Sequence, residues 1–259
     1  MAFYDYARYY EIAFDFRDVR AEVDFLLGCY ATFSGQERAT SSALEVACGP
    51  GKHAREFARR GLRSVGLDLN ATMLEYGRGR PYGSGVEWLR NDMRDFTLDV
   101  PVDLAYILTD SIVHVVNLDD MDRHLRSVAG SLTPGGLYVI EQSHPREAFA
   151  DLESYAETEW IVEARGTRVE IAWGDDEDPF DPITQRGWTT VRMRVTENGQ
   201  TLEIEEQLPA KSWLAPEMEA VIRASGVFEL AQRYGAMDAS IPFDNRPQAR
   251  KMISVLRRR

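Results

Sequence analysis

The sequence predicts an α/β fold in which helices cover both faces of a mostly parallel, doubly wound sheet of the Rossmann-like type. Apolar, strand-like runs alternate with helical patterns between residues 42 and 141. A tight turn, Gly49-Pro50-Gly51, joins the first run to the first helix of this series, which is typical of a βαβ unit. From about residue 158 the period shortens to that of antiparallel strands, so a β insert is expected after the fifth strand.

Aromatic residues dominate the N-terminal segment. Phe3, Tyr6, Tyr10 and Phe14 recur at intervals of three and four residues, which places them on one face of a helix. Two interpretations stay open. The helix is either docked by ordinary burial or forms a lid whose rings cover a cationic cofactor group, because a π face attracts a cation. A second helix is expected near 18–33, so residues 1–33 are interpreted as an N-terminal helical lid.

Five apolar runs predict the parallel strands. The run at 102–108 is almost entirely apolar, as expected for a strand that is buried on both faces of the sheet. A helix at 118–131 is expected to stop at a turn formed by Thr133-Pro134-Gly135-Gly136. The expected strands are 42–47, 64–68, 86–89, 102–108 and 137–141, with further helices at 53–60 and around Met73 and Leu74.

The β insert contains a hairpin whose two-residue turn is Asn198-Gly199, a type I′ signal. Counting outward from this turn opposes Val195 to Leu202 and Met193 to Ile204, with Arg–Glu pairs between them on the other face. This separation of apolar and charged pairs fixes the register. The expected units are the cap at 151–208 and the Rossmann-like domain at 34–150 and 209–259, which closes with a helix at 215–225 and strands at 227–234 and 251–256.

The glycine turn suits a nucleotide-type cofactor, and its chemistry separates two candidates. Residues 49–54 also fit the loose dinucleotide pattern G-x-G-x-x-G/A. A pyrophosphate needs successive N–H donors at a helix start, but Pro50 removes one donor and Glu45 adds negative charge. S-adenosylmethionine carries a sulfonium and an ammonium and no phosphate, so it is the better match. The alternatives are a nicotinamide-dependent oxidoreductase and a non-catalytic S-adenosylmethionine-binding or partner subunit.

These motifs resemble those of class I S-adenosylmethionine-dependent methyltransferases, in the pattern of small-molecule members such as the aminosugar N,N-dimethyltransferases and, more distantly, glycine N-methyltransferase. The resemblance implies a seven-stranded sheet with one antiparallel strand. It also implies an enzyme that methylates an amine or hydroxyl of a small metabolite by direct in-line transfer. The segments that carry it are Tyr10-Glu11, residues 45–51 and 92–96, Thr133-Pro134-Gly135-Gly136, and Glu141 with Glu147-Ala148-Phe149. Two departures from the family pattern are Pro50, where Thr or Ser is usual, and Phe14, where a lid Tyr is frequent.

The resemblance also assigns residues to the cofactor. Asp68 ends the second strand and is expected to accept the ribose hydroxyls. Asp92 is expected to accept the adenine amino group, while Met93 offers its backbone N–H. The full set expected at the cofactor is Tyr10, Glu45, Ala47, Cys48, Gly49, Gly51, His53, Asp68, Leu69, Met73, Asp92, Met93 and Leu108.

Histidines are the candidates for proton transfer from the substrate. His114 follows the fourth strand and His144 follows the fifth, and ligands bind beyond the carboxyl ends of such strands. Both are therefore expected to face the substrate, where a histidine can act as a general base. His53 is expected to border the methionine end of the cofactor. His124, between charged neighbours on a helix, is predicted to lie on the surface.

The amino-acid composition limits the classes of partner that the protein is expected to bind. The chain has 30 Lys and Arg against 42 Asp and Glu, a net charge of −12, which disfavours a nucleic-acid substrate because phosphate neutralisation dominates that affinity. No apolar run approaches the ~20 residues of a membrane helix. The N-terminus lacks a signal pattern, and Cys29 and Cys48 lie far apart, so a cytoplasmic location is expected. The expected partner is a small-molecule substrate, a homodimer is left open, and no metal site is expected.

Overall fold

The computed structural model describes residues 2–146 and 159–259. The Glu147-Ala148-Phe149 motif and the expected boundary between residues 150 and 151 lie outside this part of the chain. A seven-stranded sheet has the order β11-β12-β5-β4-β1-β2-β3, and only β12 runs antiparallel to its neighbours. The predicted seven-stranded, mostly parallel sheet is therefore confirmed. Its strands are β1 Ser42–Val46, β2 Arg63–Asp68, β3 Val86–Arg90, β4 Val102–Ile107, β5 Leu132–Ser143, β11 Phe228–Tyr234 and β12 Lys251–Arg258.

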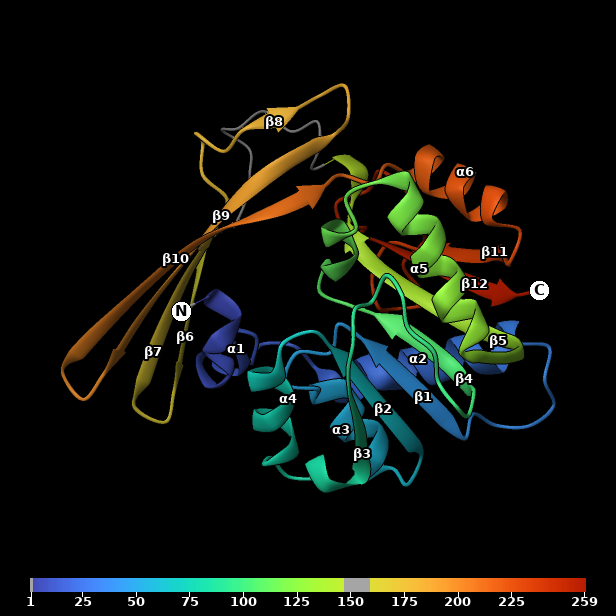
Figure 1. Cartoon of the computed structure of the whole chain (residues 1–259), viewed down its shortest axis with the longest axis horizontal. Coiled ribbons are helices and arrows are strands. Elements are labelled where there is room, and N and C mark those ends of the chain that lie inside the picture. The colour runs from blue at the N-terminus through green and yellow to red at the C-terminus, as the bar shows by residue number, and fades with distance from the viewer. Residues whose placement is uncertain (1, 147–158) are drawn as a thin grey trace.

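Helices cover both faces of this sheet (Figure 1). On one face, Met121 and Leu125 of α5 and Met218 of α6 pack into a core with Leu44 and Ile140 of the sheet. On the other face α2 and α3 form a second core, and the α2–β5 contacts anchor the chain that follows the N-terminal segment. The helices are α1 Ala7–Ala13, α2 Val19–Phe33, α3 Lys52–Arg59, α4 Ala71–Arg78, α5 Leu118–Gly130 and α6 Ala215–Ser225, with short 3-10 turns η1 Phe3–Asp5, η2 Gly83–Gly85 and η3 Ser111–His114.

The secondary structure of the stretch from Thr133 to Gly136 differs from the predicted one. It is not a turn before the strand but belongs to β5, which pairs with β4 before and after it. Leu132 opposes Val102 and Leu137 opposes Leu104, so the extra residues bulge out of the ladder. A Cβ on Gly136 would lie 2.8 Å from the Thr133 carbonyl oxygen, so the glycine lets the chain fold closely on itself.

The β insert forms a second, five-stranded sheet with β10-β9-β7-β6 in order and β8 beside β9. Its hairpin has the predicted register, with Val195 opposite Leu202 and Met193 opposite Ile204. Asn198 and Gly199 both have positive φ, 51° and 75°, as a type I′ turn requires. The strands are β6 Glu159–Ala164, β7 Thr167–Trp173, β8 Phe180–Asp181, β9 Arg186–Glu197 and β10 Gln200–Lys211.

The N-terminal aromatic segment lies between the two sheets. Figure 1 shows α1 beside β6 and β7, at the side of the cap sheet that turns toward α4. Phe3 and Ala13 are fully buried in a cluster with Val169, Met193 and Ile204 of the cap. The Trp160 indole N–H also donates to the Ala13 carbonyl oxygen at 2.8 Å. The segment is thus packed against the cap on one side and against the ends of the main sheet on the other.

Candidate functional site

The turn after β1 has the backbone geometry of a close-approach site. Gly49 and Gly51 have φ of +53° and +62°, and Ala47 is also left-handed at +52°. A Cβ at Gly51 would lie 2.6 Å from the Trp88 ring, so no larger residue fits there. A left-handed alanine costs of the order of 1–2 kcal/mol. Such strained residues cluster at active sites and ligand-binding sites.

Asp68 lies directly beside this turn. Its carboxylate accepts the Gly49 N–H at 2.7 Å and the Asn70 N–H at 2.8 Å. Burial raises the pKa of Asp68, and the two backbone donors oppose that rise. These bonds fix the carboxylate between the glycine turn and the start of α4, where the Asn70 side chain caps the helix.

A pocket opens over the glycine turn. Six of the residues expected at the cofactor line it, namely Tyr10, Glu45, Ala47, Cys48, His53 and Leu108. The pocket also has lining residues that are not in the expected cofactor set, namely Glu11, Phe14, Arg17, Val19, Pro50, Lys52, Thr109 and Ser111. Tyr10 and Phe14 lie with ring centroids 4.7 Å apart, so the N-terminal segment supplies aromatic faces to this pocket.

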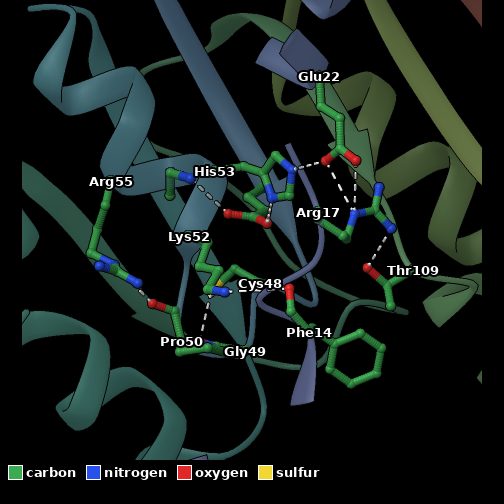
Figure 2. A network of polar contacts seen from close by, with 12 residues as sticks. Phe14, Arg17, Glu22, Cys48, Gly49, Pro50, Lys52, His53, Arg55 and Thr109 are labelled. Atoms are coloured by element: carbon green, nitrogen blue, oxygen red, sulfur yellow. Dashed lines mark hydrogen bonds and ion pairs between the residues drawn. The ribbon is translucent and has the colours of Figure 1, made fainter. Parts of the chain in front are cut away.

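A network of largely buried charges lies beside the pocket, and Figure 2 shows Arg17 between Glu22 and Thr109 in it. Arg17 donates to Glu22 at 3.0 Å, to Glu141 at 2.8 Å and to the Thr109 hydroxyl at 3.2 Å. The Glu141 carboxylate also accepts the Thr109 N–H at 2.9 Å. Burial by itself raises the pKa of Glu141, but Arg17 and Lys251 outweigh it and hold that pKa below its usual range. Arg17 therefore joins the N-terminal segment to the ends of β4 and β5.

His53 lies between two carboxylates of the same network (Figure 2). Its Nε2 is 2.5 Å from Glu22 and its Nδ1 is 3.4 Å from Glu45. Burial alone lowers the pKa of His53, but the hydrogen bonds to Glu22 and Glu45 outweigh it and raise the pKa to about 9. His53 is therefore a cation at neutral pH. It lines the pocket as a charged group, and its place at the methionine end of the cofactor stays a prediction.

The loop after β4 is held in a strained conformation. Thr109 and Asp110 are consecutive left-handed residues with φ of 56° and 58°. Asp110 accepts bonds from the Ser143 N–H and hydroxyl and lies 2.8 Å from Lys251 Nζ. Neither residue is glycine, so the conformation costs free energy that these bonds offset. The loop is thereby fixed beside the pocket.

Four further predicted cofactor residues lie outside the pocket lining, after β2, in α4 and after β3. The Leu69 side chain is exposed, whereas Met73 is buried near Gly49. The Asp92 carboxylate is bonded to Arg94 at 2.9 Å, which lowers the pKa of Asp92. The Met93 carbonyl is engaged by His124 at 2.7 Å. The assignment of these four residues to the cofactor stays a prediction, as does that of the other residues in the expected set.

The three remaining histidines lie in different surroundings. The His114 ring is 3.3 Å from the Tyr4 hydroxyl and 2.9 Å from the Pro209 carbonyl, between the N-terminal segment and the cap. His144 directly follows β5 and is buried against Phe243. Its Nε2 lies 3.1 Å from the carbonyl oxygen of Asp244, which belongs to the loop before β12. The surface prediction for His124 is wrong. It is fully buried and bonded to the Tyr138 hydroxyl at 2.7 Å, and burial lowers its pKa to about 4.

Two classes of site find no support in the described residues. Within 2–146 and 159–259, no three His, Cys, Asp or Glu side chains are grouped as a metal site would require. Among the same residues, no helix has the length and apolarity needed to cross a membrane. Both cysteines are buried and unpaired with one another.

The fold and the glycine-turn pocket define a class of protein, and comparison with known proteins identifies it. A family model described as "Methyltransferase domain" matches residues 43–136. This match, together with the sheet order and the glycine turn, supports a class I methyltransferase domain that uses S-adenosylmethionine. The predicted recognition and cofactor are confirmed, and the nicotinamide alternative is not favoured.

Several curated relatives are aminosugar methyltransferases by name. The dTDP-3-amino-3,4,6-trideoxy-alpha-D-glucopyranose N,N-dimethyltransferase of Streptomyces venezuelae is 32% identical over 43% of this chain and 46% of its own length. The dTDP-3-amino-3,6-dideoxy-alpha-D-glucopyranose N,N-dimethyltransferase of Streptomyces fradiae is 34% identical over 50% of this chain and 49% of its own. The matched region thus spans about half the length of these relatives.

Solved structures share the architecture over the whole chain. DesVI from Streptomyces venezuelae has a TM-score of 0.75 at 21% identity, covering 96% of this chain and 97% of that one. The S-adenosylmethionine-bound amino pentose methyltransferase CalS10 from Micromonospora echinaspora has a TM-score of 0.70 at 21% identity, covering 96% of both chains. These likenesses extend the fold assignment to the cap sheet and the N-terminal segment.

Proposed function

We propose that this protein transfers a methyl group from S-adenosylmethionine to the amine nitrogen of a small molecule. The observation that carries the proposal is the pocket in which Tyr10 and Phe14 close over the Gly49–Gly51 turn. Nitrogen is favoured over oxygen because the two relatives described above are N,N-dimethyltransferases by name. The cofactor would supply an electrophilic methyl on a sulfonium, so the protein's task is to bind, align and exclude water.

The charges of the lining residues fit this cofactor. Its methionine end is a zwitterion, and the pocket offers cations in Arg17 and Lys52 and acids in Glu11 and Glu45. The sulfonium suits the aromatic faces of Tyr10 and Phe14, since π faces attract cations. A pyrophosphate would instead face these acids at close range. The residues of the pocket therefore match S-adenosylmethionine in charge, and Asp68 is proposed as the acceptor of its ribose hydroxyls.

The neighbourhood of the pocket supports a small substrate. The cap sheet and the N-terminal segment cover the strand ends, so a substrate must fit between them. An amine loses a proton when it is methylated, and His114, with His144 as the second candidate, is proposed to take that proton. The net charge of −12 suits a cationic amine and disfavours nucleic acid. A cytoplasmic location is part of the proposal, supported by the two unpaired cysteines.

Isotope-labelled S-adenosylmethionine tests the proposal. The protein is incubated with the labelled cofactor and separate pools of amino sugars, sugar nucleotides, peptides and fatty acids, and products are identified by mass spectrometry. Label on a nitrogen of a small amine is the expected result. Label confined to oxygen or to a macromolecule, or calorimetry that detects no S-adenosylmethionine binding, would overturn the proposal.

A further inference from the structure

Three segments far apart in the sequence meet at the His114 ring. Tyr4 comes from η1, His114 ends η3, and Pro209 lies in β10 of the cap. The Tyr4 hydroxyl is 3.3 Å from His114 Nε2, and His114 Nδ1 is 2.9 Å from the Pro209 carbonyl oxygen. The ring is therefore bonded on one side to the N-terminal segment and on the other to the cap.

The two partners determine which ring nitrogen carries the proton. The Pro209 carbonyl oxygen can only accept, so His114 Nδ1 must be the N–H that donates to it. In the neutral imidazole, Nε2 then holds a lone pair, and the Tyr4 hydroxyl must be the donor in the second bond. The result is a chain of two bonds in one direction, from the Tyr4 hydroxyl to His114 and from His114 to the backbone. Such an arrangement leaves Nε2 ready to receive a proton.

Tyr4 connects this chain to the cofactor pocket. Its ring centroid is 5.9 Å from that of Tyr10, which lines the pocket, and Ser111 at the start of η3 lines it as well. Burial raises the pKa of the Tyr4 phenol well above its usual value, and the nearby Tyr10, Asp68 and Glu206 raise it further. The phenol is therefore protonated at neutral pH. It lies between the cofactor-site residues and the histidine.

We propose that the substrate proton reaches His114 through Tyr4: the Tyr4 oxygen takes the proton from the amine, and His114 receives the phenolic proton in its place. This inference rests on the proposed function. As the amine nitrogen forms its bond to the methyl carbon and the carbon–sulfur bond breaks, one N–H proton passes to the Tyr4 oxygen. The phenolic proton passes at the same time to His114 Nε2. The products are the methylated amine, the neutral thioether, a neutral Tyr4 and a His114 imidazolium that still donates to Pro209.

Two substitutions and their combination test the relay. Tyr4→Phe and His114→Gln are each expected to lower the single-turnover rate by roughly a hundredfold or more, the lower range of general acid–base catalysis. The double variant is expected to be no more than about threefold slower than either one, because both changes break the same chain. The substrate KM is expected to stay within about threefold. The matched control is Tyr9→Phe, which removes a lid hydroxyl that bonds Glu197 of the cap at 3.4 Å and does not contact His114.

The kinetic outcomes separate the relay from its rivals. If Tyr4→Phe keeps its rate while His114→Gln is slow, the histidine acts directly and the relay is overturned. If the two losses multiply in the double variant, or if Tyr9→Phe is equally slow, the relay is also overturned. If all variants turn over at the wild-type rate, catalysis is positional; the proposed methyl transfer then stands and the relay falls.

A measurement without substrate tests the hydrogen bond between Tyr4 and His114 independently of the proposed function. Nitrogen-15 NMR of the histidine rings in the whole 259-residue chain reports which nitrogen carries the proton. We expect the Nδ1–H tautomer for His114, with an Nε2 resonance that shifts in Tyr4→Phe and not in Tyr9→Phe. An Nε2–H tautomer, or a resonance that ignores Tyr4→Phe, would overturn the relay even if methyl transfer is found. If the NMR result is as expected but the labelled methyl group is transferred to no amine, the proposed function is overturned instead.

Discussion

The Arg17 guanidinium lies 2.8 Å from the Glu141 carboxylate and thereby ties the N-terminal segment to the end of the fifth strand. The Arg17 side chain is 12% exposed and the Glu141 side chain 3%, so this is a buried ion pair. It stands beside the pocket-lining Thr109, to which both residues also bond. The stability of the fold and the shape of the cofactor site therefore depend on the same contact.

Removing Arg17 should be strongly destabilising. Arg17→Ala leaves Glu141 buried without its nearest cation, and breaking such a pair costs about 3–5 kcal/mol. Chemical denaturation measures the free energy of unfolding. The matched control is Arg126→Ala, which breaks an exposed pair with Asp122 and should cost less than about 1 kcal/mol. Equal losses in the two variants would show that the Arg17–Glu141 pair is no stronger than a surface contact.

Stability should depend on pH through His53. Its pKa rises from 6.5 to about 9 on folding, so the folded state binds the proton more tightly. The resulting stabilisation is complete below pH ~6.5 and is lost as pH rises through about 9. The shift corresponds to roughly 3 kcal/mol, at ~1.4 kcal/mol per unit.

The experiment compares unfolding free energies at several pH values from about 6 to 9.5 for wild type and His53→Gln. Wild type should lose stability across this range, while His53→Gln should lose much less of it. Parallel curves would mean that Glu22 and Glu45 do not hold the proton on this ring. A wild-type curve that rises with pH would contradict the direction of the shift.

Asp68→Ala should weaken cofactor binding. Loss of hydrogen bonds to a charged acceptor costs about 1.5–3 kcal/mol, which is roughly ten- to a hundredfold in affinity. The same carboxylate also holds the Gly49 N–H, so the turn itself loses an anchor. Calorimetry with S-adenosylmethionine measures the change, and Asp99→Ala, an exposed acid in a loop, is the control. Unchanged affinity in a folded Asp68→Ala protein would remove Asp68 from the cofactor site.

Much of the fold followed from local pattern. The hairpin around Asn198 was predicted in register because its apolar and charged pairs alternate, and helix 215–225 was predicted with its observed bounds. The Thr133–Gly136 stretch was mistaken for a turn because its Pro and Gly residues give the same local signal in a bulge. His124 was misplaced because its charged neighbours were weighed above helical periodicity. It shares the buried face with Met121, Leu125 and Val128, at spacings of three and four residues.

The site was predictable only where its residues belong to one motif. The glycine turn and its neighbours in sequence were found, and six of the expected cofactor residues line the pocket. Arg17, Glu22, His53 and Glu141 were not recognised as a network, because their pairing depends on how distant segments meet in three dimensions. Charged residues at strand ends and beside an aromatic helix were the available signal, but sequence alone does not pair them. Tyr4 and His114 were missed as a pair for the same reason.

The last prediction concerns the N-terminal segment as a lid. Lys52, beside the glycine turn, donates to the Phe14 carbonyl at 3.3 Å and lies 2.9 Å from the Asp15 carboxylate. A cofactor bound over the turn would touch the same segment through Tyr10 and Phe14. Closure over it would exclude water from the transfer. Amide hydrogen exchange of residues 3–16 should therefore slow on addition of S-adenosylhomocysteine.

The exposed hairpin tip at 198–201 serves as the internal control and should exchange at the same rate with and without ligand. Asp68→Ala, at ligand concentrations that saturate wild type only, should show less protection of residues 3–16. Phe3 and Ala13 are already buried against the cap, so the exchange rate without ligand is the baseline for this comparison. If exchange of residues 3–16 is fully protected without ligand and does not change on binding, the segment is a fixed wall of the pocket and access must come from another direction.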